Sequence, residues 1–265
     1  MTDLLEHLRQ EVLLCDGAMG SRVQQADLDI EIDYWGQENC TEILNLSRPD
    51  IVREIQAGFV AAGSDILLTN TFGGSPITLA EFDLQDKTHE INKRAGELAR
   101  EALGEFHRDG ISRYVLGDIG PGTKLPSLGQ IDYDELEAAL AAQSAGLLAG
   151  GVDGIMIHSK SKNPDEILEF SQKYQIILKD LKLDKPLVCV PTTYNTITED
   201  ELSAAGFNII IYANHLLRSA YHAMMETAKT LLRNQRSLEA DPLCVPVREI
   251  FKTVGFLEVK EKDQQ

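Results

Sequence analysis

Short runs of apolar residues alternate with longer amphipathic stretches along most of the chain. The apolar runs are rich in Ile, Val and Leu and lack alternating polar positions, which is typical of strands buried on both faces. They predict strands at residues 12–16, 65–70, 114–118, 154–158, 186–190 and 208–213. The stretches between them predict helices at residues 50–62, 87–106, 132–149, 164–181, 199–205 and 215–233. This alternation predicts an α/β protein with a parallel sheet.

The repeat is typical of a barrel but contains too few units to close one. About six strand–helix units are clear in the 265 residues, whereas a TIM barrel has eight strands in roughly 250 residues. Strands hidden in residues 21–48 or after residue 234 would complete the count, and an open sheet is the alternative. We therefore expect one TIM-barrel-like domain over residues 1–265, with an incomplete or rearranged barrel. An open sheet leaves unpaired edges, so we also expect a homo-oligomer, most simply a dimer.

Composition narrows the class of partner and the compartment. Asp and Glu number 42 against 25 Lys and Arg, a formal net charge of −17. This charge repels phosphate backbones, so we expect no nucleic-acid partner. No segment has the roughly 20 consecutive apolar residues of a membrane-spanning helix. Residues 1–11 predict a short amphipathic helix rather than a secretory signal, so we expect a cytoplasmic protein that does not contact membranes.

Polar side chains follow the predicted strands at their carboxyl ends, where parallel α/β folds bind ligands. The candidate binding residues are Asp16, Asn70, Thr71, Asp118, His158, Ser159 and Lys160. None of them is assigned a catalytic role. Asp16 and Asp118 are equally consistent with shaping tight turns, and His158 with a solvated strand end.

Neither the cysteines nor the apolar residues of the last long predicted helix indicate a metal, redox or cofactor site. Cys15, Cys40, Cys189 and Cys244 are scattered, and none forms the close pair of a zinc or redox motif. We interpret them as reduced thiols. The last long predicted helix contains apolar residues at helical spacing, which we interpret as core packing; these are Leu217, Tyr221, Met224, Met225 and Leu231.

Four motifs in the first half carry a family resemblance: LLCDGAMGS, NCTEILNLSRPDIVREIQAGFVAAGSDILLTNTFGG, GDIGP and KLPSLGQIDYDELEAA. Over residues 13–153 the chain resembles the homocysteine-binding barrel of cobalamin-dependent methionine synthases and related homocysteine S-methyltransferases. The resemblance implies that Asp16 helps to hold the amino acid and that residues 70–72 line the same mouth. It also implies zinc held by three cysteines, two of them adjacent, that activates the substrate thiol. This chain has no adjacent cysteines, and His158 stands where the family has a glutamate for the amino group.

Motifs in the second half carry a different resemblance: GIMIHSKSKNPDEI, PLVCVPTTYN, NIIIYANHLLRSAYHAMMETAKTLL and VPVREIF. Over residues 153–256 the chain resembles phosphoenolpyruvate mutase and its relatives in the isocitrate lyase superfamily. The resemblance implies that His158, beside the cationic Lys160, contacts the phosphonate or carboxylate end of a substrate. The magnesium-binding carboxylates of that family come from early strands, whose sequence is not found here.

The two resemblances meet within the predicted strand GVDGIMI. We therefore divide the single domain into a homocysteine-methyltransferase-like segment, residues 1–153, and a phosphoenolpyruvate-mutase-like segment, residues 154–265. Both metal sites are incomplete, so we expect neither zinc nor magnesium as a cofactor. The first hypothesis is a chimeric barrel protein, engineered or recombined, without efficient parental activity, which binds a small anionic or amino-acid ligand. The alternatives are a homocysteine S-methyltransferase and a phosphoenolpyruvate mutase-like phosphonate or keto-acid enzyme.

Overall fold

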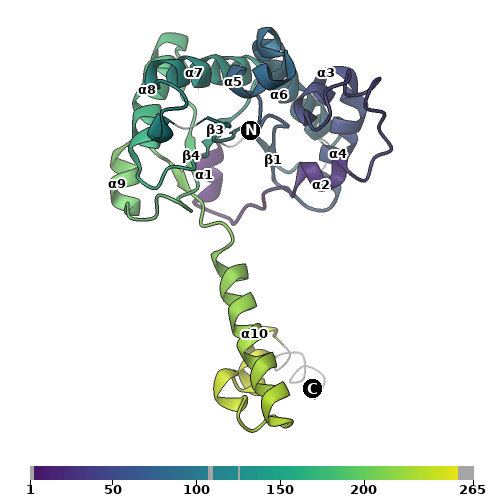
Figure 1. Cartoon of the computed structure of the whole chain (residues 1–265), viewed down its shortest axis with the longest axis vertical. Coiled ribbons are helices and arrows are strands. Elements are labelled where there is room, and N and C mark those ends of the chain that lie inside the picture. The colour runs from purple at the N-terminus through teal and green to yellow at the C-terminus, as the bar shows by residue number, and fades with distance from the viewer. Residues whose placement is uncertain (1–2, 107–109, 125, 256–265) are drawn as a thin grey trace. The chain divides into compact units, whose positions relative to one another are not determined.

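A computed structural model describes residues 3–106, 110–124 and 126–255, and the chain divides into two compact units (Figure 1). The first unit is Met1–Ile211 and the second is Tyr212–Gln265. The sequence predicts one domain with a family boundary after residue 153. That interpretation stays a prediction, because compactness of a unit does not report the ancestry of its segments.

A parallel sheet forms the centre of the first unit. Its strands are neighbours in chain order: β1 (Ile66–Leu68), β2 (Tyr114–Ile119), β3 (Gly154–Ile157), β4 (Leu187–Cys189) and β5 (Ile209–Ile210). Cys15 adds one parallel bridge to Ile66, so the first predicted strand lies beside β1. Five of the six predicted strands are present, whereas the first is reduced to this single bridge, with Val12 and Leu14 exposed rather than buried. The α/β class with a parallel sheet is confirmed. Within the described ranges β5 pairs only with β4, so the sheet does not close into a barrel.

Helices follow the strands as the sequence predicts. Those of the first unit are α1 (Leu4–Leu8), α2 (Met19–Val23), α3 (Leu44–Ser47), α4 (Pro49–Ala61), α5 (Pro76–Leu79), α6 (Thr88–Gly104), α7 (Tyr133–Ala149), α8 (Asp165–Leu181) and α9 (Glu199–Ala204). Short 3₁₀ turns lie between them: η1 (Thr41–Ile43), η2 (Ala80–Phe82), η3 (Gln85–Lys87) and η5 (Pro126–Leu128). Local chemistry sets several ends, because Asp3 caps α1, Pro49 begins α4, and Thr198 with Glu201 forms a capping box on α9.

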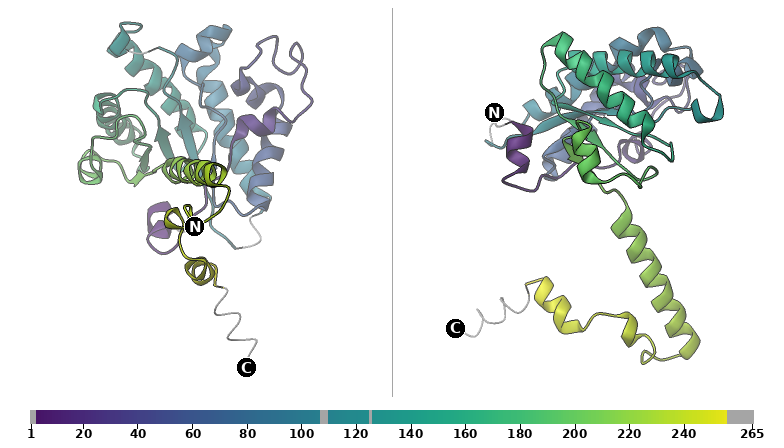
Figure 2. Two further views of the ribbon diagram at one scale, coloured as in Figure 1. Left: turned by 60° about the horizontal axis from the view of Figure 1, so that its bottom comes forward. Right: turned by 90° about the vertical axis from the view of Figure 1, so that its left-hand side faces the viewer.

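One apolar core joins the sheet to its helices and spans the predicted family boundary. Val115 and Leu147, which precede the boundary, are fully buried in the same cluster as Ile155 and Leu187, which follow it. A Cβ atom on Gly117 would lie 2.9 Å from the Leu147 side chain, so glycine allows α7 to approach β2 closely. In Figure 2 the longer helices of this unit lie on one face of the sheet. The two predicted segments therefore share one interior.

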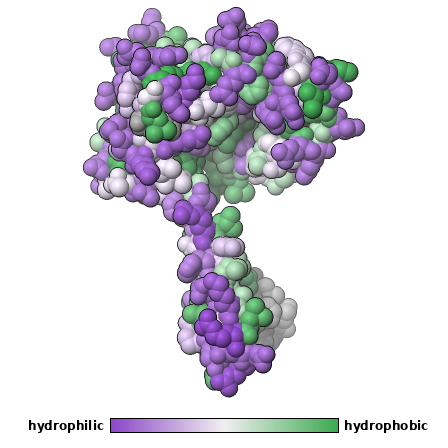
Figure 3. Space-filling model, in the orientation of Figure 1, coloured by the Kyte–Doolittle hydropathy of each residue, from purple (hydrophilic) through white to green (hydrophobic). Residues whose placement is uncertain are grey.

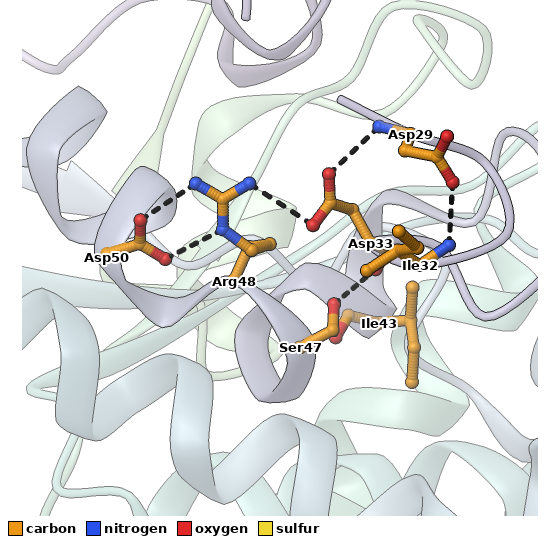
Figure 4. Close-up of polar contacts among 7 residues, drawn as sticks. All are labelled: Asp29, Ile32, Asp33, Ile43, Ser47, Arg48 and Asp50. Carbon is orange, nitrogen blue, oxygen red and sulfur yellow. Dashed lines mark hydrogen bonds and ion pairs between the residues drawn. The ribbon is translucent and has the colours of Figure 1, made fainter. Parts of the chain in front are cut away.

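The long connection before α4 is fixed by a polar network rather than by a strand (Figure 4). The Arg48 guanidinium bonds Asp33 at 3.2 Å and Asp50 at 2.9 Å, and it lowers the pKa of Asp50. Asp33 also accepts the Asp29 backbone N–H at 2.9 Å, and the Ser47 hydroxyl donates to the Asp33 carbonyl at 2.5 Å. These bonds order the segment that delivers η1 and α3 to the carboxyl end of β1.

The second unit comprises α10 (His215–Asn234), η6 (Asp241–Leu243) and α11 (Val247–Thr253). The prediction that the apolar face of α10 is core packing is wrong for this chain, because no residue of α10 is buried. The exposed fractions are 71% for Leu217, 63% for Tyr221, 61% for Met224, 39% for Met225 and 39% for Leu231. Apolar side chains are visible on the surface of this unit (Figure 3). Helical spacing identifies an apolar face, but it does not identify what covers that face.

Neither α10 nor any other helix in the described ranges combines the length and the apolar character that a membrane crossing requires.

Candidate functional site

Asp118 and His158 meet at the carboxyl ends of β2 and β3. The register pairs Asp118 with Met156, so His158, two residues further along, lies on the same face as Asp118. Asp118 Oδ1 lies 3.1 Å from His158 Nε2, and the two side chains are 12% and 25% exposed. The sequence placed both residues at strand ends, and the structure brings them into direct contact.

Asp16 presents an unpaired carboxylate oxygen near this pair. Its Oδ2 accepts the Leu68 backbone N–H at 3.0 Å, whereas its buried Oδ1 has no hydrogen-bond partner among the described residues. Burial raises the pKa of Asp16 to about 7, the Leu68 N–H opposes this shift, and the nearby Asp118 charge adds to it. An unpaired buried acceptor next to a second carboxylate favours a cationic hydrogen-bond donor, such as an ammonium group.

Thr71 and Asn70 are bonded within the protein. The Thr71 hydroxyl donates to the Asp118 carbonyl at 2.7 Å and lies 2.6 Å from the Thr69 hydroxyl, which accepts the Asp118 N–H at 3.0 Å. The Asn70 amide donates to the Thr41 carbonyl at 2.7 Å, and Asn45 donates to the Asn70 carbonyl at 2.8 Å. These bonds hold the loop after β1 against the end of β2. A direct contact of Asn70 or Thr71 with a ligand stays a prediction.

Phe72 places an aromatic ring beside the Asp118–His158 pair. Its ring centroid lies 5.4 Å from that of His158, and the residue is 52% exposed. The Gly120 N–H donates to the Phe72 carbonyl at 3.0 Å, and a Cβ on Gly120 would lie 2.2 Å from that oxygen. Only glycine therefore permits this approach of the two loops.

Ser159 and Lys160 make contacts away from the two aspartates. The Ser159 hydroxyl donates to Glu166 Oε2 at 2.5 Å, and Lys160 Nζ donates to the Gly122 carbonyl at 3.2 Å. Ser159 is partly buried and Lys160 is exposed. Of the candidate residues, Asp16, Asp118 and His158 thus form the centre of the site.

Glu42 belongs to the site but was missed by the sequence analysis. It is 7% exposed, and its Oε1 accepts the Gly73 N–H at 2.6 Å. Burial is the main cause that raises its pKa, the Gly73 N–H opposes the shift, and the Asp118 charge adds to it. The signal in the sequence was a carboxylate directly before the apolar pair Ile43 and Leu44.

Replacement of Glu42 by Gln should stabilise the protein at pH 8. A carboxyl whose pKa is raised on folding stabilises the fold while it is protonated, and this contribution is lost as pH rises above its unfolded pKa. Gln keeps the acceptor for Gly73 without the charge. We expect Tm at pH 8 to rise by about 2–4 °C, the shift for about 1 kcal/mol in a domain of this size, and the difference to disappear near pH 4. Glu54→Gln, on the exposed surface of α4, is the control; an equal effect there would contradict the assignment.

The available donors do not fit either metal that the resemblances imply. The zinc site that the resemblance implies needs three thiolates, two of them from adjacent cysteines, and the four cysteines of this chain include no adjacent pair. Asp118 Oδ1 already contacts His158. Among the described residues no group of three or more His, Cys, Asp or Glu side chains is arranged to hold a metal ion. We derive no chemical step through a metal, and the expectation of no cofactor stays a prediction.

Comparison with known sequences gives a family match that extends beyond the predicted boundary. The family model described as Homocysteine S-methyltransferase matches residues 13–196, including residues 154–196 of the second segment. Methionine synthases of Mycobacterium leprae (strain TN) and Mycobacterium tuberculosis (strain ATCC 25618 / H37Rv) are 41% and 40% identical to the chain over 158 residues. These matches cover 60% of this chain and 13% of each relative, so the chain spans about one eighth of their length.

Solved structures from both predicted families share the fold. The metallated homocysteine methyltransferase MmuM from Escherichia coli has a TM-score of 0.55 at 19% identity, covering 69% of this chain and 64% of that one. Phosphonopyruvate hydrolase in complex with oxalate and Mg²⁺ has a TM-score of 0.61 at 24% identity, covering 82% and 68%. Phosphoenolpyruvate phosphomutase from Streptomyces platensis subsp. rosaceus has a TM-score of 0.55 at 20% identity, covering 98% of both chains. The predicted two-part resemblance is confirmed, and at these identities the structural likeness concerns the fold alone.

Proposed function

The chain belongs to the homocysteine S-methyltransferase family, and from this we propose that it binds a small α-amino acid between Asp16, Asp118 and His158. The observation that carries the proposal is the buried, unpaired Oδ1 of Asp16. An α-ammonium group supplies the N–H donors and the positive charge that this oxygen lacks. We assign the carboxylate of the same ligand to Lys160 because it is a cationic residue two positions after His158 in the sequence.

We propose further that methyl transfer by this protein is inefficient. Thiol activation in the family is expected to need zinc thiolates, and the chain has no adjacent cysteines. The shared fold of phosphonopyruvate hydrolase supports the mutase-like alternative only at the level of architecture. A chimeric origin, with residues 1–153 and 154–265 from the two families, remains our proposal and is supported by the separate motifs on either side of the boundary.

Calorimetric titration with matched ligands tests the proposed function. L-methionine should bind, whereas 4-(methylthio)butanoate, which lacks only the α-ammonium group, should bind at least about tenfold more weakly, because a charged hydrogen bond is lost. Equal binding of the two ligands would contradict the ammonium site. Homocysteine methylation that appears on addition of zinc would favour the methyltransferase alternative. Magnesium-dependent binding of oxalate or phosphonopyruvate would favour the mutase-like alternative.

We also propose that the protein is a homodimer in which a second copy covers the apolar face of α10. Leu216 and Leu232, near the two ends of this helix, are also exposed, at 87% and 81%. α10 has Arg218, Lys229 and Arg233 against Glu226, a formal charge of +2, while the whole chain has −17. The remainder of a second copy is therefore strongly acidic and complements α10, whereas two α10 helices would place like charges together.

A cytoplasmic location is part of the same proposal. The four cysteines Cys15, Cys40, Cys189 and Cys244 are all free thiols. Thiols persist in the reducing cytosol and form disulfides in secretory compartments.

A further inference from the structure

Residues 27–38 form a largely exposed loop that begins with alternating acidic and apolar residues. Ile30 is 42% exposed, Ile32 is 73% exposed and Trp35 is 43% exposed. The Gly36 backbone N–H donates to the Ile30 carbonyl at 2.8 Å, so the segments that carry Ile30 and Trp35 lie together. Scattered exposed apolar residues need no explanation, but a group of them on one loop indicates an interaction surface.

The 27–38 loop holds Trp35, the single tryptophan of the chain, in a conformation that bulky residues rarely adopt. The φ angle of Trp35 is +52°, in the left-handed region. Asp33 fixes the loop around it by bonds to Arg48 at 3.2 Å and to the Asp29 backbone N–H at 2.9 Å (Figure 4). Backbone strain at a half-exposed tryptophan supports a role in binding, because tryptophan is enriched among the residues that dominate interface affinity.

The exposed acidic residues give the 27–38 loop a negative charge. No Lys or Arg occurs within it, and the Asp33 carboxylate already pairs with Arg48. The exposed carboxylates are those of Asp27, Asp29, Glu31 and Glu38. The loop therefore presents apolar side chains bordered by carboxylates, which complement an apolar surface bordered by cations.

α10 has an apolar stripe with cations along one edge. At about 100° per helical residue, Leu217, Tyr221 and Met224 share one face of α10. Arg218 and Lys229 follow at one edge of this face, and both are exposed. This pattern is the complement of the 27–38 loop, both in apolar surface and in charge.

We propose that the 27–38 loop of one copy covers the apolar face of α10 in a second copy. Ile30, Ile32 and Trp35 contact the apolar stripe, and the carboxylates of the loop face the cations at its edge. This proposal rests on the homodimer proposed above and adds the surface that the second copy presents. A twofold dimer contains the contact twice, because each copy offers one loop and one α10.

The single tryptophan makes this contact measurable in the unmodified protein. Dilution of the dimer should shift the Trp35 fluorescence to longer wavelength, because water reaches the indole ring when the second copy leaves. The shift should follow the concentration range in which sedimentation reports dissociation. A dimer that dissociates without any change in Trp35 emission would contradict the loop contact alone. A protein that is monomeric at every concentration would overturn the homodimer and the loop contact together.

Replacing Trp35 by Ala should weaken the dimer by about thirtyfold or more, the effect of removing a dominant interface residue. Sedimentation equilibrium measures the dissociation constant. Ile176→Ala, at a residue of α8 that is 55% exposed, removes apolar surface elsewhere and should leave the dimer intact. A Trp35→Ala variant that dimerises as tightly as the wild type would contradict the proposal.

Charge reversal on the two surfaces tests whether the contact joins two copies. Glu31→Lys with Glu38→Lys in the loop, and Arg218→Glu with Lys229→Glu in α10, should each weaken self-association by about tenfold or more, because like charges then meet. The two variants change the net charge in opposite directions, so a weakening of both is not an effect of net charge. The Lys229–Glu226 pair is half-exposed, and its loss costs little within the chain.

An equal mixture of these two variants should form heterodimers with nearly the affinity of the wild type. In the heterodimer the reversed loop faces the reversed α10, and the native loop faces the native α10. A mixture that stays monomeric would contradict a contact between copies. Recovery only when all four substitutions are in one chain would place the contact within a single copy, which also overturns the proposal.

Discussion

Replacing Leu217 and Met224 together by Glu should convert the protein from a dimer into a monomer of 29.3 kDa. Both side chains are more than half exposed in the chain, and the dimer proposal buries them against a second copy. Burial of a Leu or Met side chain is worth about 1.5–3 kcal/mol. Placing a carboxylate there costs more still, because the charge would be desolvated without a partner. The expected weakening of the dimer is therefore at least a thousandfold, and sedimentation equilibrium over a range of concentrations measures it.

A matched pair of substitutions controls for the change in net charge. Ser219→Glu with Ala223→Glu adds the same two charges at exposed residues on the opposite face of the same helix. This control should remain dimeric. A wild-type protein that stays monomeric at every concentration, or a Leu217 and Met224 variant that stays dimeric, would contradict the assignment of α10.

Replacing Asp16 by Asn should weaken L-methionine binding at pH 8 by about tenfold or more, while thermal stability at the same pH increases. The loss of affinity follows from removal of the charge that faces the α-ammonium group. The stability change has the opposite sign because the pKa of Asp16 is raised from 3.8 to about 7 on folding. Such a carboxyl stabilises the fold when protonated, and that contribution is lost as pH rises from about 4 to 7. Asn avoids this loss and keeps an acceptor for the Leu68 N–H.

These opposite signs separate a lost contact from a damaged fold. Calorimetry measures the affinity and differential scanning measures Tm on the same samples. Asp86→Asn, at an exposed residue of η3, should change neither quantity. If Asp16→Asn bound L-methionine as tightly as the wild type, Asp16 would be a structural residue of its turn, as the plain interpretation of the sequence has it.

The strands and helices followed from the sequence because their signals are local. The ends of β2 and β3, which are apolar runs, and of α6 and α8, which are amphipathic stretches, were predicted within one or two residues. The position of Asp118 and His158 at one edge of the sheet also followed, because parallel strands place their carboxyl ends there, whereas their direct contact was not predicted. Sheet closure did not follow, because it depends on the pairing of β5 with a distant strand rather than on its own composition.

Contacts between distant segments account for what the sequence analysis missed. Glu42 joins the site through the Gly73 N–H, 31 residues away along the chain, and no periodicity encodes that bond. A ligand contact of Thr71 stays a prediction, whereas the bond from its hydroxyl to the Asp118 carbonyl, 47 residues away, was not foreseen. The spacing of apolar residues correctly identified an apolar face on α10. It did not show that this face is exposed in the single chain. For these residues the sequence shows a polar or apolar side chain of functional interest, but it does not show which residue or surface that side chain contacts.

The protonation of Asp16 itself gives the most direct test of the amino-acid site. NMR titration of the Asp16 carboxyl carbon in the free protein should give a pKa near the value of about 7 that burial produces. Saturation with L-methionine should lower this pKa by at least about one unit, since a neighbouring ammonium group stabilises the carboxylate. An Asp16 pKa that is unchanged, or raised, when L-methionine is bound would contradict the account.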